Sequence, residues 1–373
     1  LSHINAIGEL CAQFRRGILA MIRSVGAEAA IETVEAYHRL YPAAAQSCWY
    51  PAVFEQLDSP EWQQLYVNAE HDGKVGVITI SREAYNYDVD AELNRAIDWL
   101  KAAGIGKVIL TGDFHLATQM IGADTSEFFP ALSDVAEGRR VAATWAATAR
   151  RLHNEFQVSV GFVNGKRCLG GFLELLLHCH YAVAVEDASL GMPEVTLPVV
   201  PGMEGCHWPF RKTDESQWPK LVRMLLGGTP VKAKDAVDWL IDYAGPLPEA
   251  LQTVWRLAAD GAAGLTMRKP QSGALKGIPA DVVRSFQATG IAHVVAGVPT
   301  NTRRDKTYHN IVFDRRTTVE YTGRWGVLDL MQEYSLTSAQ ALEVSDHMPV
   351  WAEFGVYEGA VGPLALQPGG SAR

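Results

Sequence analysis

Several features are scarce in this sequence, and each scarcity narrows the class of protein. Its cysteines are Cys11, Cys48, Cys168, Cys179 and Cys206. They are scattered, odd in number and without metal-site spacing, which is typical of reduced thiols rather than of a disulfide framework. No apolar stretch reaches the ~18 to 20 residues that a membrane span needs, and the N-terminus lacks the residue order of a signal peptide. These features predict a cytoplasmic protein that does not associate with membranes.

Low-complexity tracts and long blocks of like charge are also absent. The formal net charge is -9, and acidic and basic residues are interleaved. No broad surface for nucleic acid or for an anionic membrane is therefore expected. Apolar residues, in contrast, make up 48% of the 373 residues, which is enough to build cores for two domains.

Hydrophobic periodicity divides the chain into parts with different predicted secondary structure. Residues 4–41 predict two amphipathic helices interrupted at Gly26. From Tyr66, a strand pair around Asp72-Gly73 opens an alternation of strands and helices, which indicates an α/β fold. The strands predicted after this pair are 107–112, 158–163 and 181–185, and two more are predicted near the C-terminus, at 308–313 and 350–356. The predicted division is a helical extension (1–64), an α/β domain (65–260), a linker (261–291) and a short C-terminal α+β fragment (292–373).

Two glycine-bearing junctions between a strand and a helix carry candidate chemistry, at 121–124 and 168–171. The first N–H groups of a helix lack partners within it and point outward with the positive end of the dipole. Two such donors that meet at one point would stabilise the oxyanion formed from a thioester carbonyl, typically by ~3 to 4 kcal/mol per donor.

Two glutamates follow the second junction. Glu174 lies one turn into a strongly apolar helix that starts near Gly171, and Glu194 follows the next strand. A carboxylate among apolar residues is costly unless it is paired or used, so both are candidate acid/base groups. The alternative is a structural carboxylate that satisfies buried backbone groups, and the glycines could serve tight turns alone.

These residues occur in ordered motifs that resemble the enoyl-CoA hydratase/isomerase (crotonase) superfamily. The motifs are Thr111-Gly112, Gly122-Ala123-Asp124, Asn164-Gly165, Leu169-Gly170-Gly171 with Glu174-Leu175, Leu190-Gly191 with Pro193-Glu194, and Pro201-Gly202. The resemblance covers about 190 residues and implies a crotonase-like ββα spiral core over residues 65–260.

The resemblance also implies an activity and a site. The expected reaction is addition of water to an enoyl-CoA thioester, or a shift of its double bond, in fatty acid metabolism. The backbone N–H groups of Ala123 and Gly171 would form the oxyanion hole, and Glu174 and Glu194 would handle water and proton. The implied substrate-binding residues are Ala123, Asp124, Thr125, Ser126, Gly170 and Gly171. No metal and no cofactor is expected beyond the coenzyme A of the substrate.

Three residues depart from the family pattern. Phe172 replaces a third glycine, His180 replaces an Asp, and Glu204 occupies a glycine place in the turn after Pro201. Glu204 is interpreted either as a third carboxylate at the site or as an acid at a helix start. His178 and His180 cannot share a metal ion on a helix, because residues i and i+2 point in different directions, so core or interface histidines are expected.

A second resemblance lies near the C-terminus, in 292–358. Ser345-Asp346-His347 with Pro349, together with Tyr308 and Asn310, resembles the end of the DNase I-like endonuclease/exonuclease/phosphatase family. There the matching Asp346 and His347 would hold a metal and activate water. The family's upstream ligands have no counterpart here, so a fragment without nuclease activity is expected.

The fragment replaces the final helices that crotonases use to form trimers, so the trimer or hexamer implied by the family stays open. Two rival functions also remain. One is a metal-dependent phosphodiesterase centred on Asp346 and His347, with a basic run at Arg303, Arg304, Lys306, Arg315 and Arg316. The other is a non-catalytic scaffold.

Overall fold

The computed structural model describes most of the chain. The described residues are 1–14, 16–43, 49–112, 119–120, 122–124, 127, 134–197, 199–261, 264–272, 291–295, 298–305, 309, 311–314, 318 and 320–355. They fall into two compact units, Leu1–Lys276 and Gly277–Arg373, which are described separately.

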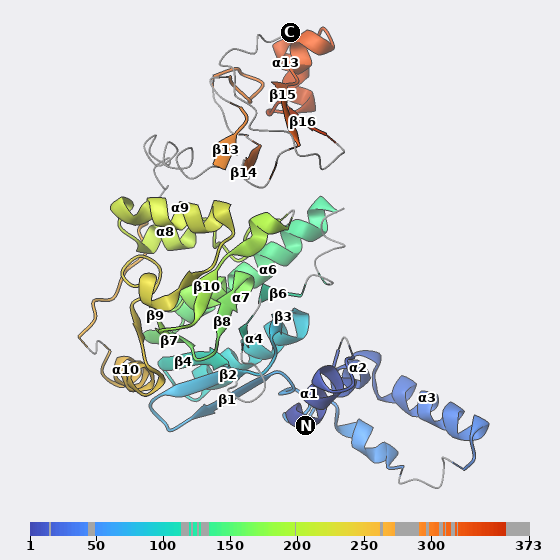
Figure 1. Ribbon diagram of the computed structural model, residues 1–373. Coiled ribbons are helices and arrows are strands. Elements are labelled where there is room, and N and C mark those ends of the chain that lie inside the picture. Colours follow the sequence, from blue (N-terminus) through green and yellow to red (C-terminus); the bar gives the residue numbers. More distant parts are fainter. Residues whose placement is uncertain are drawn as a thin grey trace. The chain divides into compact units, whose positions relative to one another are not determined.

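The first unit begins with helices rather than strands (Figure 1). The described residues of this segment form α1 (Ser2–Leu10), α2 (Ile18–Val25), α3 (Ala27–Leu40) and the 3-10 helix η2 (Pro51–Gln56). The prediction of two helices was wrong by one, because the chain leaves α1 at Leu10 and starts α2 only at Ile18. The interruption at Gly26 is confirmed, since its φ of 86° is a left-handed conformation that favours glycine.

Ion pairs join these helices to the rest of the unit. Arg23 donates to Asp88 at 3.1 Å and to Glu92 at 2.6 Å, and Arg16 donates to Asp88 at 2.7 Å. The Glu92 carboxylate also accepts the backbone N–H groups of Tyr66 and Val67, at 2.7 and 2.9 Å. The start of the first strand and the N-terminal helices are therefore held by the same carboxylate.

A six-stranded sheet forms the centre of the unit, in the order β1-β2-β4-β7-β9-β12. Its strands are β1 (Val67–His71), β2 (Gly76–Ile80), β4 (Lys107–Gly112), β7 (Val158–Val163), β9 (Tyr181–Val185) and β12 (Tyr243–Gly245). Only β1 and β2 are antiparallel. The predicted turn is confirmed at Asp72, whose side chain accepts the N–H groups of Lys74 and Val75.

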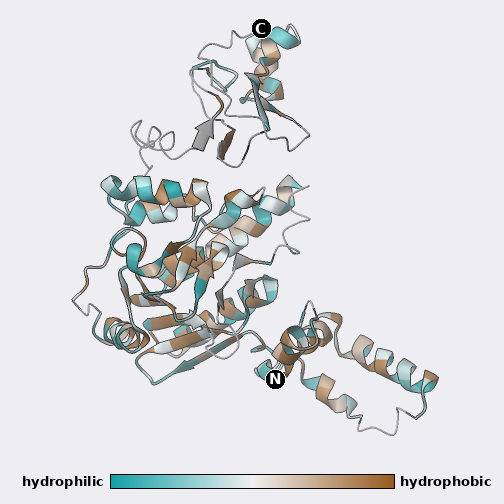
Figure 2. Cartoon of the chain, viewed as in Figure 1, coloured by the Kyte–Doolittle hydropathy of each residue, from teal (hydrophilic) through white to brown (hydrophobic). Residues whose placement is uncertain are grey.

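Apolar composition explains why this sheet is buried. Every residue of β7 and of β9 is buried, as expected of parallel strands covered on both faces. The strands predicted at 107–112, 158–163 and 181–185 are confirmed, and apolar residues gather on the inner strands (Figure 2). The helices of this part are α4 (Tyr87–Ala102), α6 (Val135–Asn154), α7 (Gly170–Leu177), α8 (Trp208–Lys212), α9 (Trp218–Gly227) and α10 (Leu247–Asp260).

A second sheet runs in the order β11-β10-β8-β5 and leads into α7. Its strands are β5 (Gln119–Met120), β8 (Arg167–Leu169), β10 (Ser189–Gly191) and β11 (Val231–Lys232). A shorter pair joins β3 (Ala84–Tyr85) to β6 (Gly122–Ala123) in parallel. The α/β class predicted from the alternation of strands and helices is thus confirmed, and no helix among the described residues is long and apolar enough to cross a membrane.

The second unit is smaller, and its described residues form two strand pairs. They are β13 (Ile291–His293) with β14 (Val312–Asp314), and β15 (Tyr321–Val327) with β16 (Val350–Phe354), and the short helices α12 (Leu330–Glu333) and α13 (Ser338–Val344) lie between the last two strands in sequence. The strand predicted at 350–356 is confirmed over β16. The strand predicted at 308–313 begins later, at Val312, while residues 308 and 310 lie outside the described residues.

Candidate active site

The two glycine junctions of the sequence meet in space. Gly122 has a φ of 97°, and a Cβ at this position would lie 3.3 Å from the Gly171 nitrogen. Similarly, a Cβ on Gly171 would lie 3.6 Å from the Ala123 nitrogen. The amides of Ala123 and Gly171 are therefore neighbours, although they come from β6 and from the first turn of α7. The Gly171 amide belongs to the helix start, where N–H groups have no partner within the helix.

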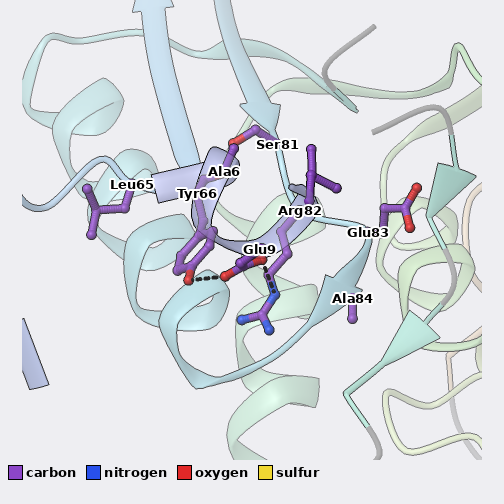
Figure 3. Close-up of a pocket in the computed structure, with 9 residues that line it drawn as sticks. Ala6, Glu9, Leu65, Tyr66, Ser81, Arg82, Glu83 and Ala84 are labelled. Atoms are coloured by element: carbon purple, nitrogen blue, oxygen red, sulfur yellow. Dashed lines mark hydrogen bonds and ion pairs between the residues drawn. The ribbon is translucent and has the colours of Figure 1, made fainter. Parts of the chain in front are cut away.

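Asp124 follows directly and is engaged by the protein itself. Arg82 Nη2 lies 3.2 Å from Asp124 Oδ2, and Arg82 Nε lies 3.6 Å from Glu9 Oε2. Figure 3 shows Arg82 and Tyr66 converging on Glu9 of α1 at the wall of a pocket, where the Tyr66 hydroxyl donates to Glu9 at 2.6 Å. The substrate-binding role of Asp124 stays a prediction, and Thr125 and Ser126 lie outside the described residues.

Glu174 is buried in α7, with 2% of its surface exposed. Its Oε2 accepts the backbone N–H of Met203 at 2.8 Å and that of Gly205 at 2.6 Å. Burial and the nearby charge of Glu194 raise the pKa of Glu174 to about 8, against the lowering effect of these hydrogen bonds. A carboxyl group that holds its proton near neutral pH can act as an acid or, once ionised, as a base.

Glu194 lies in the 3-10 helix η4 (Pro193–Thr196), which follows β10. Its Oε1 would be only 2.7 Å from a Cβ on Gly170, whose φ is 52°. Its Oε2 is buried and has no hydrogen-bond partner within the described part of the chain. Burial raises the pKa of Glu194 as well. A buried carboxylate oxygen without a partner is costly in a folded protein, and it suits a group that meets a ligand or water.

Glu204 does not add a third carboxylate to this pair. Its side chain contacts Arg150 of α6, with 3.0 Å between Arg150 Nε and Glu204 Oε2, and His178, with 3.2 Å between Nε2 and Oε2. Burial raises the pKa of Glu204, but the hydrogen bonds and charges of His178 and Arg150 outweigh it and hold the pKa at about 2. The other interpretation, an acid at a helix start, does not describe Glu204 either, because α8 has His207 as its N-cap and no acidic residue in its first turn.

The two histidines are buried, which agrees with the prediction of core or interface residues, but the helix expected to carry them ends at Leu177. The His178 ring stacks on Trp208 with 4.3 Å between centroids and 15° between planes. His180 Nδ1 lies 2.9 Å from the Ser159 hydroxyl. No group of three potential metal ligands occurs among the described residues.

Sequence reasoning missed the partners of Glu174. Met203 and Gly205 donate through their backbones, which no side-chain pattern reveals. The motif Pro201-Gly202 was a signal of a tight turn here, but it did not show where the turn's amides point. Arg150 gave no signal at all, because it is one of several charged residues on α6.

The predicted C-terminal pair lies in the second unit. Asp346 Oδ1 is 3.6 Å from His347 Nε2, and the two side chains are 78% and 40% exposed. His309 contacts His347, with 2.5 Å between His309 Nε2 and His347 Nδ1. Of the predicted basic run, only Arg303 and Arg304 are among the described residues. The DNase I-like resemblance stays a prediction.

Comparisons with known proteins match about half of the chain. No protein-family model matches it. A probable enoyl-CoA hydratase of Bacillus subtilis is 28% identical over 180 residues, which are 47% of this chain and 67% of that protein. The alpha subunit of the fatty acid oxidation complex of Idiomarina loihiensis is 39% identical over 93 residues, 24% of this chain and 12% of that subunit.

Among solved structures, an enoyl-CoA hydratase from Thermoplasma volcanium covers 53% of this chain and 79% of its own, at 20% identity and a TM-score of 0.46. The chain spans two thirds of the first sequence relative and about an eighth of the second. The sequence relatives support the crotonase/enoyl-CoA hydratase superfamily for about half of the chain.

Proposed function

We propose that the chain is an acyl-CoA hydratase or isomerase of the crotonase type. One observation carries this proposal: two carboxyl groups with raised pKa values, the buried Glu174 and the half-buried Glu194, lie around a helix start whose Gly171 amide neighbours that of Ala123. The relatives named as enoyl-CoA hydratases add the substrate class, a coenzyme A thioester.

In the proposed reaction, the thioester oxygen of the substrate accepts the N–H groups of Ala123 and Gly171. These donors stabilise the enolate that develops when water attacks Cβ of the conjugated double bond. One carboxylate takes a proton from the water as its oxygen bonds to Cβ, and the other carboxyl group gives a proton to Cα. The elements of water are added across the double bond and no electrons are exchanged with a cofactor.

The raised pKa of Glu174 suits a reaction in which one carboxyl group acts as the acid and the other as the base. At neutral pH the pair must hold one proton and one negative charge, because a fully ionised pair has no acid and a fully protonated pair has no base. Burial and mutual repulsion favour the singly protonated pair. The unpartnered Oε2 of Glu194 is then available to water or substrate.

The test is turnover of a panel of enoyl-CoA thioesters that differ in chain length and branching. Loss of absorbance of the conjugated double bond reports hydration, and its gain from a 3-enoyl-CoA reports isomerisation. Release of free thiol would instead show hydrolysis. Glu186→Gln, an exposed position after β9, serves as the control and should keep wild-type rates. Absence of any change with every thioester would contradict the proposal and favour a non-catalytic scaffold.

A further inference from the structure

The turn from Gly202 to Gly205 sets the position of the Glu174 carboxylate. Two of its amides, those of Met203 and Gly205, donate to the same oxygen, Glu174 Oε2. A Cβ on Gly205 would lie 2.7 Å from that oxygen, so the backbone itself approaches the carboxylate. Glu204 lies between the two donors, and any rotation of its backbone would move both of them.

Glu204 occupies an unusual backbone conformation. Its φ is 71°, in the left-handed region that residues with a side chain seldom adopt. Such conformations persist when the surrounding contacts hold them. The contacts here are made by the side chain of Glu204: Arg150 engages both carboxylate oxygens, one of them at 3.0 Å from Nε, and His207 Nε2 lies 3.5 Å from Oε1.

His178 connects Glu204 to Glu174 by a second route. Its Nδ1 lies 2.9 Å from the backbone oxygen of Glu174, and its Nε2 lies 3.2 Å from Glu204 Oε2. Both partners are acceptors, so both contacts are hydrogen bonds only when both ring nitrogens carry a proton. The His178 ring also stacks on Trp208, with 4.3 Å between the ring centroids. Glu174 is therefore held at its carboxylate and at its carbonyl, and both links lead to Glu204.

We propose that Glu204 is a positioning residue, which uses Arg150 and His178 to fix the turn that aims the Glu174 carboxylate. The charged or titratable groups that face it come from three places: Arg150 from α6, His178 from the end of α7, and His207 from the start of α8. The consequence for turnover rests on the proposed function of Glu174, whereas the consequence for the Glu174 carboxyl group itself does not.

The first experiment replaces Arg150, the exposed partner of Glu204. Arg150→Gln removes the guanidinium at a side chain that is 54% exposed, so the core remains intact. The 13Cδ resonance of Glu174, identified by its loss in Glu174→Gln, is titrated in 13C-glutamate-labelled protein. We expect the midpoint to rise by about one pH unit, because weaker amide bonds stabilise the carboxylate less. Arg151→Gln removes the neighbouring guanidinium, which pairs with Glu155 and Asp98, and should leave the midpoint unchanged.

Turnover provides the second readout. With an enoyl-CoA substrate, Arg150→Gln should lower kcat by about tenfold to a hundredfold with little change in KM, as expected when a catalytic group is displaced rather than removed. Equal midpoints and equal kcat in Arg150→Gln and wild type would overturn the proposal. If the wild type turns over no thioester, the proposed function fails, and the titration alone still decides the role of Glu204.

A second variant separates the side chain from the backbone. Glu204→Gly relieves the left-handed strain but removes every contact of the carboxylate. If the side chain positions the turn, the glycine variant should show the same raised midpoint and lowered kcat as Arg150→Gln. If its titration and kcat match those of the wild type, the backbone conformation alone holds the turn, and the proposed role of the side chain is wrong.

Discussion

Two regions of this chain carry an acidic residue within a motif that resembles a known family, one around Glu174 and one around Asp346. The surroundings of the two acidic residues differ. Glu174 is 2% exposed and receives two backbone N–H groups, whereas the side chain of Asp346 is 78% exposed beside His347. The proton affinity of a buried carboxyl group such as Glu174 is set by its burial and by the charges and donors around it. A motif becomes a candidate site when the fold buries it and supplies donors.

The largest expected difference between the two regions is in turnover. Glu174→Gln should lower the rate with an enoyl-CoA thioester by two orders of magnitude or more, because it removes a general acid/base group but keeps the shape of the side chain. Steady-state kinetics checks this, with Glu186→Gln as control. A near-normal rate in Glu174→Gln would exclude the proposed role.

Gly170→Ala tests the close approach between the second glycine junction and the Glu194 carboxylate. A Cβ at this position would lie 2.7 Å from Glu194 Oε1, so the carboxylate must move, and we expect kcat to fall about tenfold or more. The left-handed backbone, with a φ of 52°, adds a cost of about 1 kcal/mol to stability.

Gly104→Ala is the matched control for that variant. Gly104 has a φ of 75° and open space around its Cβ direction, so the backbone cost is similar but no carboxylate is displaced. Denaturant unfolding should show similar losses of stability in the two variants, and only Gly170→Ala should lose activity. Equal kcat in both variants would show that the position of Glu194 does not matter.

The pH dependence of stability is a smaller effect. The pKa of Glu174 is raised from 4.5 to about 8, so the native state binds this proton more tightly than the unfolded chain. This contribution to stability is fully present below pH 4.5 and is lost as the pH rises through about 8. Glu174→Gln has no carboxyl proton to release, so this loss of stability should not occur in the variant. Its Tm relative to wild type should therefore increase from about pH 5 to about pH 9, as scanning calorimetry can measure. A Tm difference that is constant with pH would contradict a buried protonated Glu174.

The smallest effect is expected at the C-terminal pair. Asp346→Asn and His347→Ala should leave the Tm in magnesium chloride unchanged, because the described residues gather no group of three metal ligands and Mg²⁺ needs several oxygen ligands. Thermal shift with and without magnesium tests this. Magnesium-dependent cleavage of a phosphodiester that disappears in His347→Ala would instead promote the rival phosphodiesterase function.

The sequence by itself determined the elements that depend on neighbours along the chain. The apolar runs at 158–163 and 181–185 became buried parallel strands, the Asp72-Gly73 pair became a hairpin turn, and Gly26 interrupted the N-terminal helices. The motifs also singled out Glu174 and Glu194 as candidate acid/base groups. Local patterns suffice in these cases because periodicity and turn preferences act over a few residues.

Only the tertiary structure decided how these parts act on one another. Met203 and Gly205 reach Glu174 across about thirty residues of chain, and Arg150 reaches Glu204 across more than fifty. The donating groups are backbone amides and one arginine on a helix. Neither kind of group can be recognised from composition or periodicity. The proton affinity of a carboxyl group depends on its burial and on the charges and donors around it, and these exist only after distant segments have packed together.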